Sequence, residues 1–186
     1  MRVRLWSSAA YPHERVNMTG SYPDSLVHHL RYHRWASNTL LQAVTALSPP
    51  VLLLERGTSF KTIPQTLSHI YMADQVWFSR LTGHSAGVPI PARDFALSPF
   101  AAQWNDLLDR YVGWAEPLTP EEWERSIQYR NSEGKEFSNP IWQIALHVVN
   151  HGTAHRAQVV SMLRQSNVTP PNLDLITYYR APPTRL

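Results

Sequence analysis

Four segments with helical periodicity constrain the fold of this chain more than any other feature. Apolar residues recur every three or four positions within residues 24–47, 62–82, 98–116 and 139–166. Such segments each carry one apolar stripe, and packing the stripes against one another is the simplest way to remove them from water. The sequence therefore predicts an all-α protein, a four-helix bundle.

Capping residues, prolines and a glycine mark the ends of these segments. Asp24 is a suitable N-cap for the first, which ends before Pro49. Thr62 opens the second, with Pro64 in its first turn, and Gly83 follows its last residue. A capping residue followed by proline opens the third and fourth segments, at Ser98-Pro99 and at Asn139-Pro140.

The remaining parts of the chain are less regular. Between the third and fourth segments, Ser126–Arg130 and Glu136–Ser138 alternate around Asn131–Gly134, a pattern typical of a short hairpin or extended excursion. Residues 1–22 show no periodicity and are expected to form an irregular arm. Met18 lies just before the periodic pattern begins and is therefore an alternative start to Met1. Residues 23–186 are then expected to form one domain.

Composition excludes several kinds of site. The chain has no cysteine, so a metal must use His, Asp or Glu, and disulfides and cysteine nucleophiles are excluded. It has no apolar run of about 20 residues and no apolar secretory leader, so we expect a cytoplasmic protein without a membrane partner. The formal charge of +3 rests on scattered arginines rather than on one basic cluster, which argues against nucleic-acid binding.

Three histidines at four-residue spacing, His147, His151 and His155, lie on the fourth segment. Each four-residue step along a helix turns by only about 40° and rises about 6 Å, so adjacent members can share one ion. A solvated polar surface is the simpler alternative. His69 favours the metal site, because it is an isolated histidine within the apolar second segment and can act as a third ligand.

Other polar residues are expected to play supporting parts. His147 lies about 80° from His155 around the helix axis and is expected to support or pack rather than bind. Gln65 and Gln158 lie on the ligand faces and are the other candidates for support of the ligands. His29 and His33 could form a second pair, but without a third donor an exposed polar face explains the histidines of the first segment. Asp74 could orient a ligand or act as a base near the metal, but it lies about 140° from His69 around the helix, so a surface or interhelical salt bridge is favoured.

The motifs resemble those of the DinB family in order and spacing over residues 24–180. The resemblance rests on Tyr32-His-Arg-Trp35-Ala36, Leu67-Ser-His69-Ile-Tyr-Met-Ala-Asp74-Gln-Val-Trp77, His147-Val-Val-Asn-His151-Gly-Thr-Ala-His155-Arg and Pro171-Asn-Leu-Asp174-Leu-Ile-Thr-Tyr178-Tyr179. The chain departs from the family pattern in small ways, with Ser37, Asp74 and Ala157 where Asn, Glu and Gly are usual.

The resemblance implies a helical bundle that binds a divalent metal, often nickel or zinc, through His69, His151 and His155. It also implies a homodimer, and relatives that include transferases and isomerases using low-molecular-weight thiols. Iron, cobalt and copper also suit a three-histidine site.

Three functions stay open at this stage. The first is a metal-dependent enzyme that transfers a thiol to a small molecule or hydrolyses it at a mononuclear site. The second is a non-enzymatic metal-binding stress-response protein, and the third is a nucleic-acid-associated damage-response protein. The sequence identifies no catalytic base: it has no His-Glu-x-x-His or Glu-x-x-His element.

Overall fold

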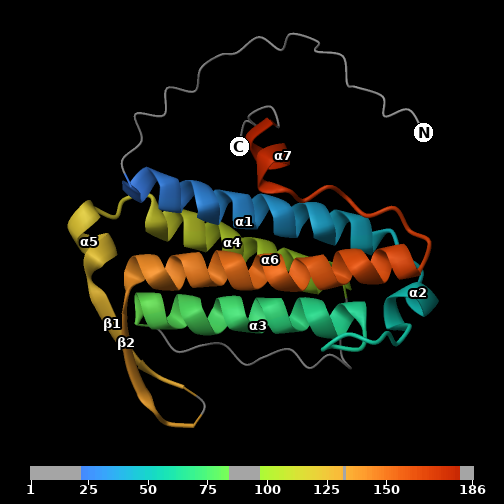
Figure 1. Ribbon diagram of the computed structural model, residues 1–186, viewed down its shortest axis with the longest axis horizontal. Helices are drawn as coiled ribbons and strands as arrows, with labels where there is room; N and C mark the ends of the chain where they lie inside the picture. The colour runs from blue at the N-terminus through green and yellow to red at the C-terminus, as the bar shows by residue number, and fades with distance from the viewer. Residues whose placement is uncertain (1–21, 84–96, 132, 181–186) are drawn as a thin grey trace, which may run out of the picture.

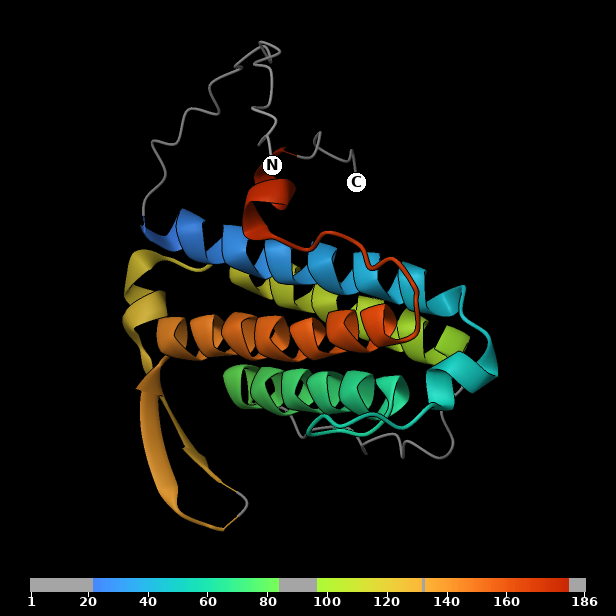
Figure 2. The ribbon, with the colours of Figure 1, turned by 45° about the vertical axis from the view of Figure 1, so that its right-hand side comes forward.

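Helices dominate the computed structural model, which describes residues 22–83, 97–131 and 133–180. The four long helices are α1 (Tyr22–Thr45), α3 (Ile63–Thr82), α4 (Leu97–Ala115) and α6 (Ile141–Gln165). They lie side by side in Figure 1, with α3 next to α6 and α1 next to both α4 and α6. The turned view in Figure 2 keeps α3 and α6 adjacent, so these two helices share one face of the molecule.

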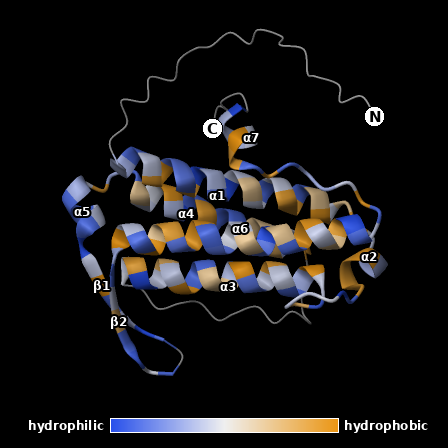
Figure 3. Ribbon diagram, in the orientation of Figure 1, coloured by the Kyte–Doolittle hydropathy of each residue, from blue (hydrophilic) through white to orange (hydrophobic). Residues whose placement is uncertain are grey.

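Each long helix places an apolar stripe in a common core. Figure 3 shows hydrophobic and hydrophilic residues alternating around each of them. The largest wholly buried apolar side chains include Trp104, Phe100 and Tyr111 of α4 and Leu30 of α1. Trp123 joins them from the short helix α5 (Pro120–Glu124). None of the described helices is long and apolar enough to cross a bilayer.

The ends of α3 form as the sequence predicts. The Thr62 hydroxyl accepts the backbone N–H of Gln65, and the Gln65 side-chain oxygen accepts the backbone N–H of Thr62, which makes a capping box. At the other end Gly83 adopts a left-handed φ of 72°, and its N–H donates to the Ser79 carbonyl. The capping box fixes where α3 begins and therefore the position of His69, the seventh residue of this helix.

Other boundaries differ from the prediction. Helix α1 begins at Tyr22, so Asp24 lies in its first turn rather than at its N-cap. Pro49 and Pro50 do not merely end a helix: they occupy the first turn of α2 (Pro49–Leu53), where proline costs no hydrogen bond. Asn139 and Pro140 belong to strand β2, with extended backbone, and α6 starts one residue later.

The expected hairpin is confirmed. Strand β1 (Ser126–Arg130) pairs antiparallel with β2 (Glu136–Pro140), in a register that places Tyr129 opposite Phe137. Gly134 takes a φ of 79° in the turn, a conformation that favours glycine. The hairpin projects beyond the long helices at the end of α3 (Figure 1). Helices α2, α5 and α7 (Leu175–Arg180) have five or six residues, too few to show a period, and were not predicted.

The prediction of an irregular arm at residues 1–22 falls almost wholly outside the described residues, as do Met1 and Met18.

Candidate metal centre

Three histidines meet where α3 packs against α6. One ring nitrogen of each of His69, His151 and His155 lies within 4.8 Å of the corresponding atoms of the other two. His69 Nε2 and His151 Nε2 are 3.0 Å apart, and the His155 ring centroid is 4.5 Å from that of each of the others. All three side chains are half-buried, so the group they form is partly accessible to solvent.

Local structure explains why the three rings converge. His151 and His155 are separated by one turn of α6 and therefore project from the same side of it. His69 projects from α3 between Leu67 and Ile70, both of which are wholly buried. The apolar packing of α3 on α6 thus places a single histidine of one helix opposite a pair on the other.

The surroundings of His69 and His151 disfavour protonation of both rings. The pKa of His151 is lowered to about 4, mainly by burial and additionally by His155 and His69, while the Asp74 carboxylate acts in the opposite direction. Burial also lowers the pKa of His69, and His155 adds to that effect. A second proton on any of these rings would lie beside the other two. Neutral imidazoles, each with a free lone pair, are the form that binds a metal ion.

The donor set fits a divalent transition metal. Two imidazole nitrogens on one tetrahedral zinc ion lie about 3.3 Å apart, given Zn–N bonds of about 2.0–2.1 Å. The 3.0 Å between His69 and His151 is close to that spacing. Moreover, the Gln158 side-chain oxygen accepts a hydrogen bond from His155 Nδ1 at 3.3 Å, which leaves the Nε2 lone pair of this ring free.

The other predicted site residues take different places. Gln158 contacts a proposed ligand, as described above. His147 is exposed, outside the three-nitrogen group, with its ring centroid 5.9 Å from that of His151 and 5.1 Å from that of Trp77. Gln65 serves the capping box at Thr62, and no hydrogen bond joins it to the three histidines in the described part of the chain.

An aromatic ring that the sequence did not mark covers one side of the group. Phe60 precedes α3, and its ring stacks on His69 with centroids 4.3 Å apart and an interplanar angle of 27°. It also meets His155 edge-on at 5.6 Å. Phe60 therefore gives the site an apolar wall. No periodic pattern or motif in the sequence connects it with the histidines.

A second polar cluster lies deeper, on the inner side of α6. His33 of α1 is 1% exposed, so the expectation that an exposed face explains it is wrong. Its Nε2 lies 3.1 Å from Asp74 Oδ2 and its Nδ1 lies 2.8 Å from Arg156 Nη1. Because Arg156 only donates, His33 Nδ1 accepts, and the ring's single proton is on Nε2, from which it is donated to Asp74.

Asp74 and Arg156 are thus linked through a neutral histidine. Asp74 is 1% exposed, so its expected surface position is wrong; it does pair between helices, but through a hydrogen bond with the neutral His33 rather than through a salt bridge. Trp104 Nε1 donates a second hydrogen bond to Asp74 Oδ2 at 2.8 Å. Arg156 also donates to Ser37 Oγ at 3.2 Å and to Thr153 Oγ1 at 2.9 Å. We call His33, Asp74 and Arg156 the buried triad.

Gly152 makes room for the buried triad. A Cβ on Gly152 would lie 2.3 Å from His33 Cε1 and 2.7 Å from Arg156 Nη1, closer than side-chain atoms approach. A glycine inside a helix costs about 1 kcal/mol relative to alanine. A glycine at position 152, between His151 and His155, therefore indicates close packing there. Ala157, where the family usually has glycine, is exposed and does not affect the approach of α6 to its neighbours.

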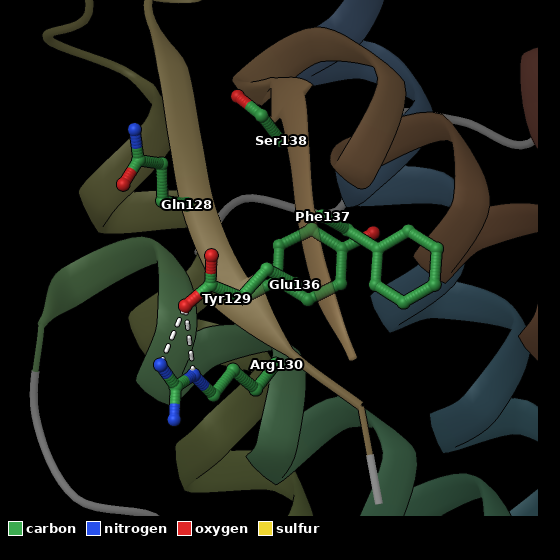
Figure 4. Close-up of a pocket in the computed structure, with 6 residues that line it drawn as sticks. All are labelled: Gln128, Tyr129, Arg130, Glu136, Phe137 and Ser138. Atoms are coloured by element: carbon green, nitrogen blue, oxygen red, sulfur yellow. Dashed lines mark hydrogen bonds and ion pairs between the residues drawn. The ribbon is translucent and has the colours of Figure 1, made fainter. Parts of the chain in front are cut away.

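An open hollow of about 440 Å³ lies beside the hairpin, and its lining residues all come from β1 and β2, so none of the three histidines lines it. Figure 4 shows Arg130 and Glu136 joined across the strands there, together with the rings of Tyr129 and Phe137. It offers none of the nitrogen donors described above, so we place the candidate site at the histidines.

Comparisons with known proteins agree with the fold and the motifs. The chain is 24% identical over 141 residues to protein DinB of Bacillus subtilis, a match that covers 73% of this chain and 82% of that protein. A crystal structure of a DinB-like protein from Bacillus cereus superimposes with a TM-score of 0.62 at 18% identity, covering 80% of this chain and 95% of that one. The model of the DinB family matches residues 18–185, and the chain therefore belongs to the DinB family.

Proposed function

We propose that this protein binds one divalent transition-metal ion through His69, His151 and His155, on a four-helix bundle of the DinB type, and acts on a small molecule at that ion. The observation that carries the proposal is the convergence of three ring nitrogens from two helices within 4.8 Å. Zinc and nickel are the ions that we expect first, because imidazole nitrogen suits both.

The histidines and their neighbours prepare the site for such chemistry. Three neutral ligands leave the full charge of the ion uncompensated, so a bound ion supplies Lewis acidity and lowers the pKa of a water or thiol. Gln158 accepts a hydrogen bond from His155, and the Phe60 ring covers one side of the group with an apolar surface. This arrangement supports thiol transfer or hydrolysis, with a low-molecular-weight thiol as the proposed cosubstrate and a homodimer as the proposed assembly.

Metal analysis of the purified protein tests the binding step. We expect about one ion per chain in the wild type, and loss of that ion in His151→Ala. His147→Ala is the matched control, because His147 lies one turn away on the same helix but outside the three-nitrogen group. Full occupancy in His151→Ala would contradict the ligand assignment.

A screen of the metal-loaded protein tests the activity. Conjugation of thiols to small electrophiles and hydrolysis of small esters and amides are the reactions to examine. We expect turnover that His69→Ala abolishes without loss of helicity. Stoichiometric metal binding with no turnover of any of these substrates would instead favour a non-enzymatic metal-binding protein.

A further inference from the structure

Two buried polar atoms near the metal centre lack a hydrogen-bond partner among the described residues. One is Nδ1 of His151 and the other is Oδ1 of Asp74, and both atoms are inaccessible to solvent. Buried polar atoms are usually paired, because an unpaired one has lost its hydrogen bonds to water without gaining others. One atom is a ring nitrogen that carries a proton when Nε2 is a ligand, and the other is a carboxylate oxygen that accepts.

The two atoms belong to neighbouring parts of the structure. Asp74 holds His33 through Oδ2, and the His33 ring stands against Gly152, the residue after His151. The carboxylate is also close enough to act on the charge of His151, in the direction that favours a proton there. Because His33 and Trp104 both donate to Oδ2, only Oδ1 is left to face another donor.

We propose that Asp74 is a positioning residue for the metal centre: its Oδ1 accepts the Nδ1–H of His151, directly or through one bridging water, when Nε2 of that ring binds the ion. This inference rests on the proposed metal function. It assigns the buried triad a task beyond holding α1, α3 and α6 together. Arg156 orients His33, His33 and Trp104 orient the carboxylate, and the carboxylate fixes the tautomer of His151.

Fixing the tautomer matters for binding. A proton on Nδ1 leaves the lone pair on Nε2, the atom that already lies 3.0 Å from His69 Nε2. A carboxylate behind the ring also raises its basicity as a ligand. Loss of such an outer partner typically costs about 10-fold to 100-fold in metal affinity.

Asp74→Asn is the sharpest test, because the geometry dictates how the amide must lie. Two donors, His33 Nε2–H and Trp104 Nε1–H, face the Oδ2 position, so the amide oxygen takes that place. The amide NH₂ then takes the place of Oδ1 and faces His151. It repels a proton on Nδ1 and favours the opposite tautomer, in which the proton occupies the metal-binding Nε2.

We expect Asp74→Asn to weaken Co²⁺ and Zn²⁺ binding by about 10-fold to 100-fold in titrations of the folded protein. In the zinc-loaded wild type, ¹⁵N chemical shifts should place the proton of His151 on Nδ1 and show it protected from exchange with solvent. Ser37→Ala is the matched control, since it removes a partner of Arg156 and leaves Asp74 Oδ1 untouched. Its metal affinity should stay within about threefold of the wild type.

The possible outcomes are distinct. A wild type that binds no metal would overturn the proposed function itself. A wild type that binds, with unchanged affinity and His151 tautomer in Asp74→Asn, would overturn only the role of Asp74. If Asp74→Asn does not fold, the wild-type spectrum decides alone: a rapidly exchanging His151 Nδ1–H in the zinc-loaded protein contradicts the inference.

Discussion

Helix α6 carries two polar clusters on neighbouring faces of the same two turns. His151 and His155 face α3 at the half-buried candidate metal centre, whereas Gly152 and Arg156, one position later, are buried against α1. One position along a helix is a turn of about 100°, so the sequence His-Gly-Thr-Ala-His-Arg interleaves two stripes.

The two clusters differ in how their charges are balanced. In the buried triad, the positive charge of Arg156 and the negative charge of Asp74 are joined through His33. At the metal centre, three basic nitrogens face one another and disfavour protons, as the lowered pKa of His151 and His69 indicates. Burial of polar groups therefore does not by itself mark a ligand site. A ligand site is marked instead by donor atoms that face one another and need an added cation to balance them.

The largest expected effect comes from opening the buried triad. Arg156→Ala would leave the Asp74 carboxylate buried without its countercharge, which should lower the free energy of unfolding by about 3–5 kcal/mol. Chemical unfolding followed by circular dichroism measures the change. Arg31→Ala is the control, because Arg31 of α1 pairs with Glu116, the residue after α4, and both of these side chains are exposed. We expect at most about 1 kcal/mol there, and equal losses in the two variants would remove the distinction between the clusters.

At the metal centre the effect on stability should depend on the ion. Zinc at a hundred times its Kd should raise the free energy of unfolding by about 2.7 kcal/mol, or the Tm by about 5–10 °C. In His155→Ala we expect this increment to disappear while the metal-free protein keeps its stability to within about 1 kcal/mol. Thermal unfolding with and without zinc measures both quantities. A zinc-dependent increment that survives in His155→Ala would contradict the ligand role.

Gly152→Ala probes the contact between the two stripes. The added methyl group must push His33 and Arg156 aside, and overpacking of this kind costs about 1–3 kcal/mol. Gly113→Ala on α4 is the matched control, since a Cβ there meets nothing within 4 Å. That substitution should stabilise the protein by about 0.5–1 kcal/mol through helix propensity. The same unfolding measurement applies, and a neutral Gly152→Ala would show that the triad can move freely.

The smallest effect should be the pH dependence of the metal-free protein. The pKa of His151 is about 4 in the folded protein and about 6.5 when unfolded. As the pH falls, the unfolded chain therefore takes up this proton at a higher pH than the folded protein does. The stabilising contribution is complete above pH 6.5 and is lost as the pH falls towards 4. Urea unfolding at pH 7 and pH 5 should therefore show lower stability at pH 5, and His151→Asn should reduce the difference. An undiminished difference in that variant would assign the pH dependence to other groups.

Much of the fold could be predicted from local signals. Thr62 with Gln65, Gly83, and the alternation around Asn131–Gly134 each act within a few residues, so the sequence shows them directly. The convergence of His69 with the pair on α6 was predicted from spacing and from the family motifs. Its ligand role stays a prediction.

What could not be predicted depends on contacts between distant segments. Nothing near His33 in the sequence indicates that its partners are Asp74 and Arg156, 41 and 123 positions away. A histidine that is neutral and hydrogen-bonded at both nitrogens can be buried, yet its residue type alone suggests an exposed position. Phe60 is missed for the same reason, because its contact with His69 depends on how the loop before α3 folds back.

The interleaving of the two stripes has a consequence for protein design. Grafting the three histidines onto another helical scaffold would transfer the donor atoms without the residues proposed to orient their rings. A faithful graft would also carry the glycine and arginine that follow them on α6, and a histidine and an aspartate on two partner helices. The transferable unit is thus a contact region between three helices, and the proposed metal ligands are only its outward half.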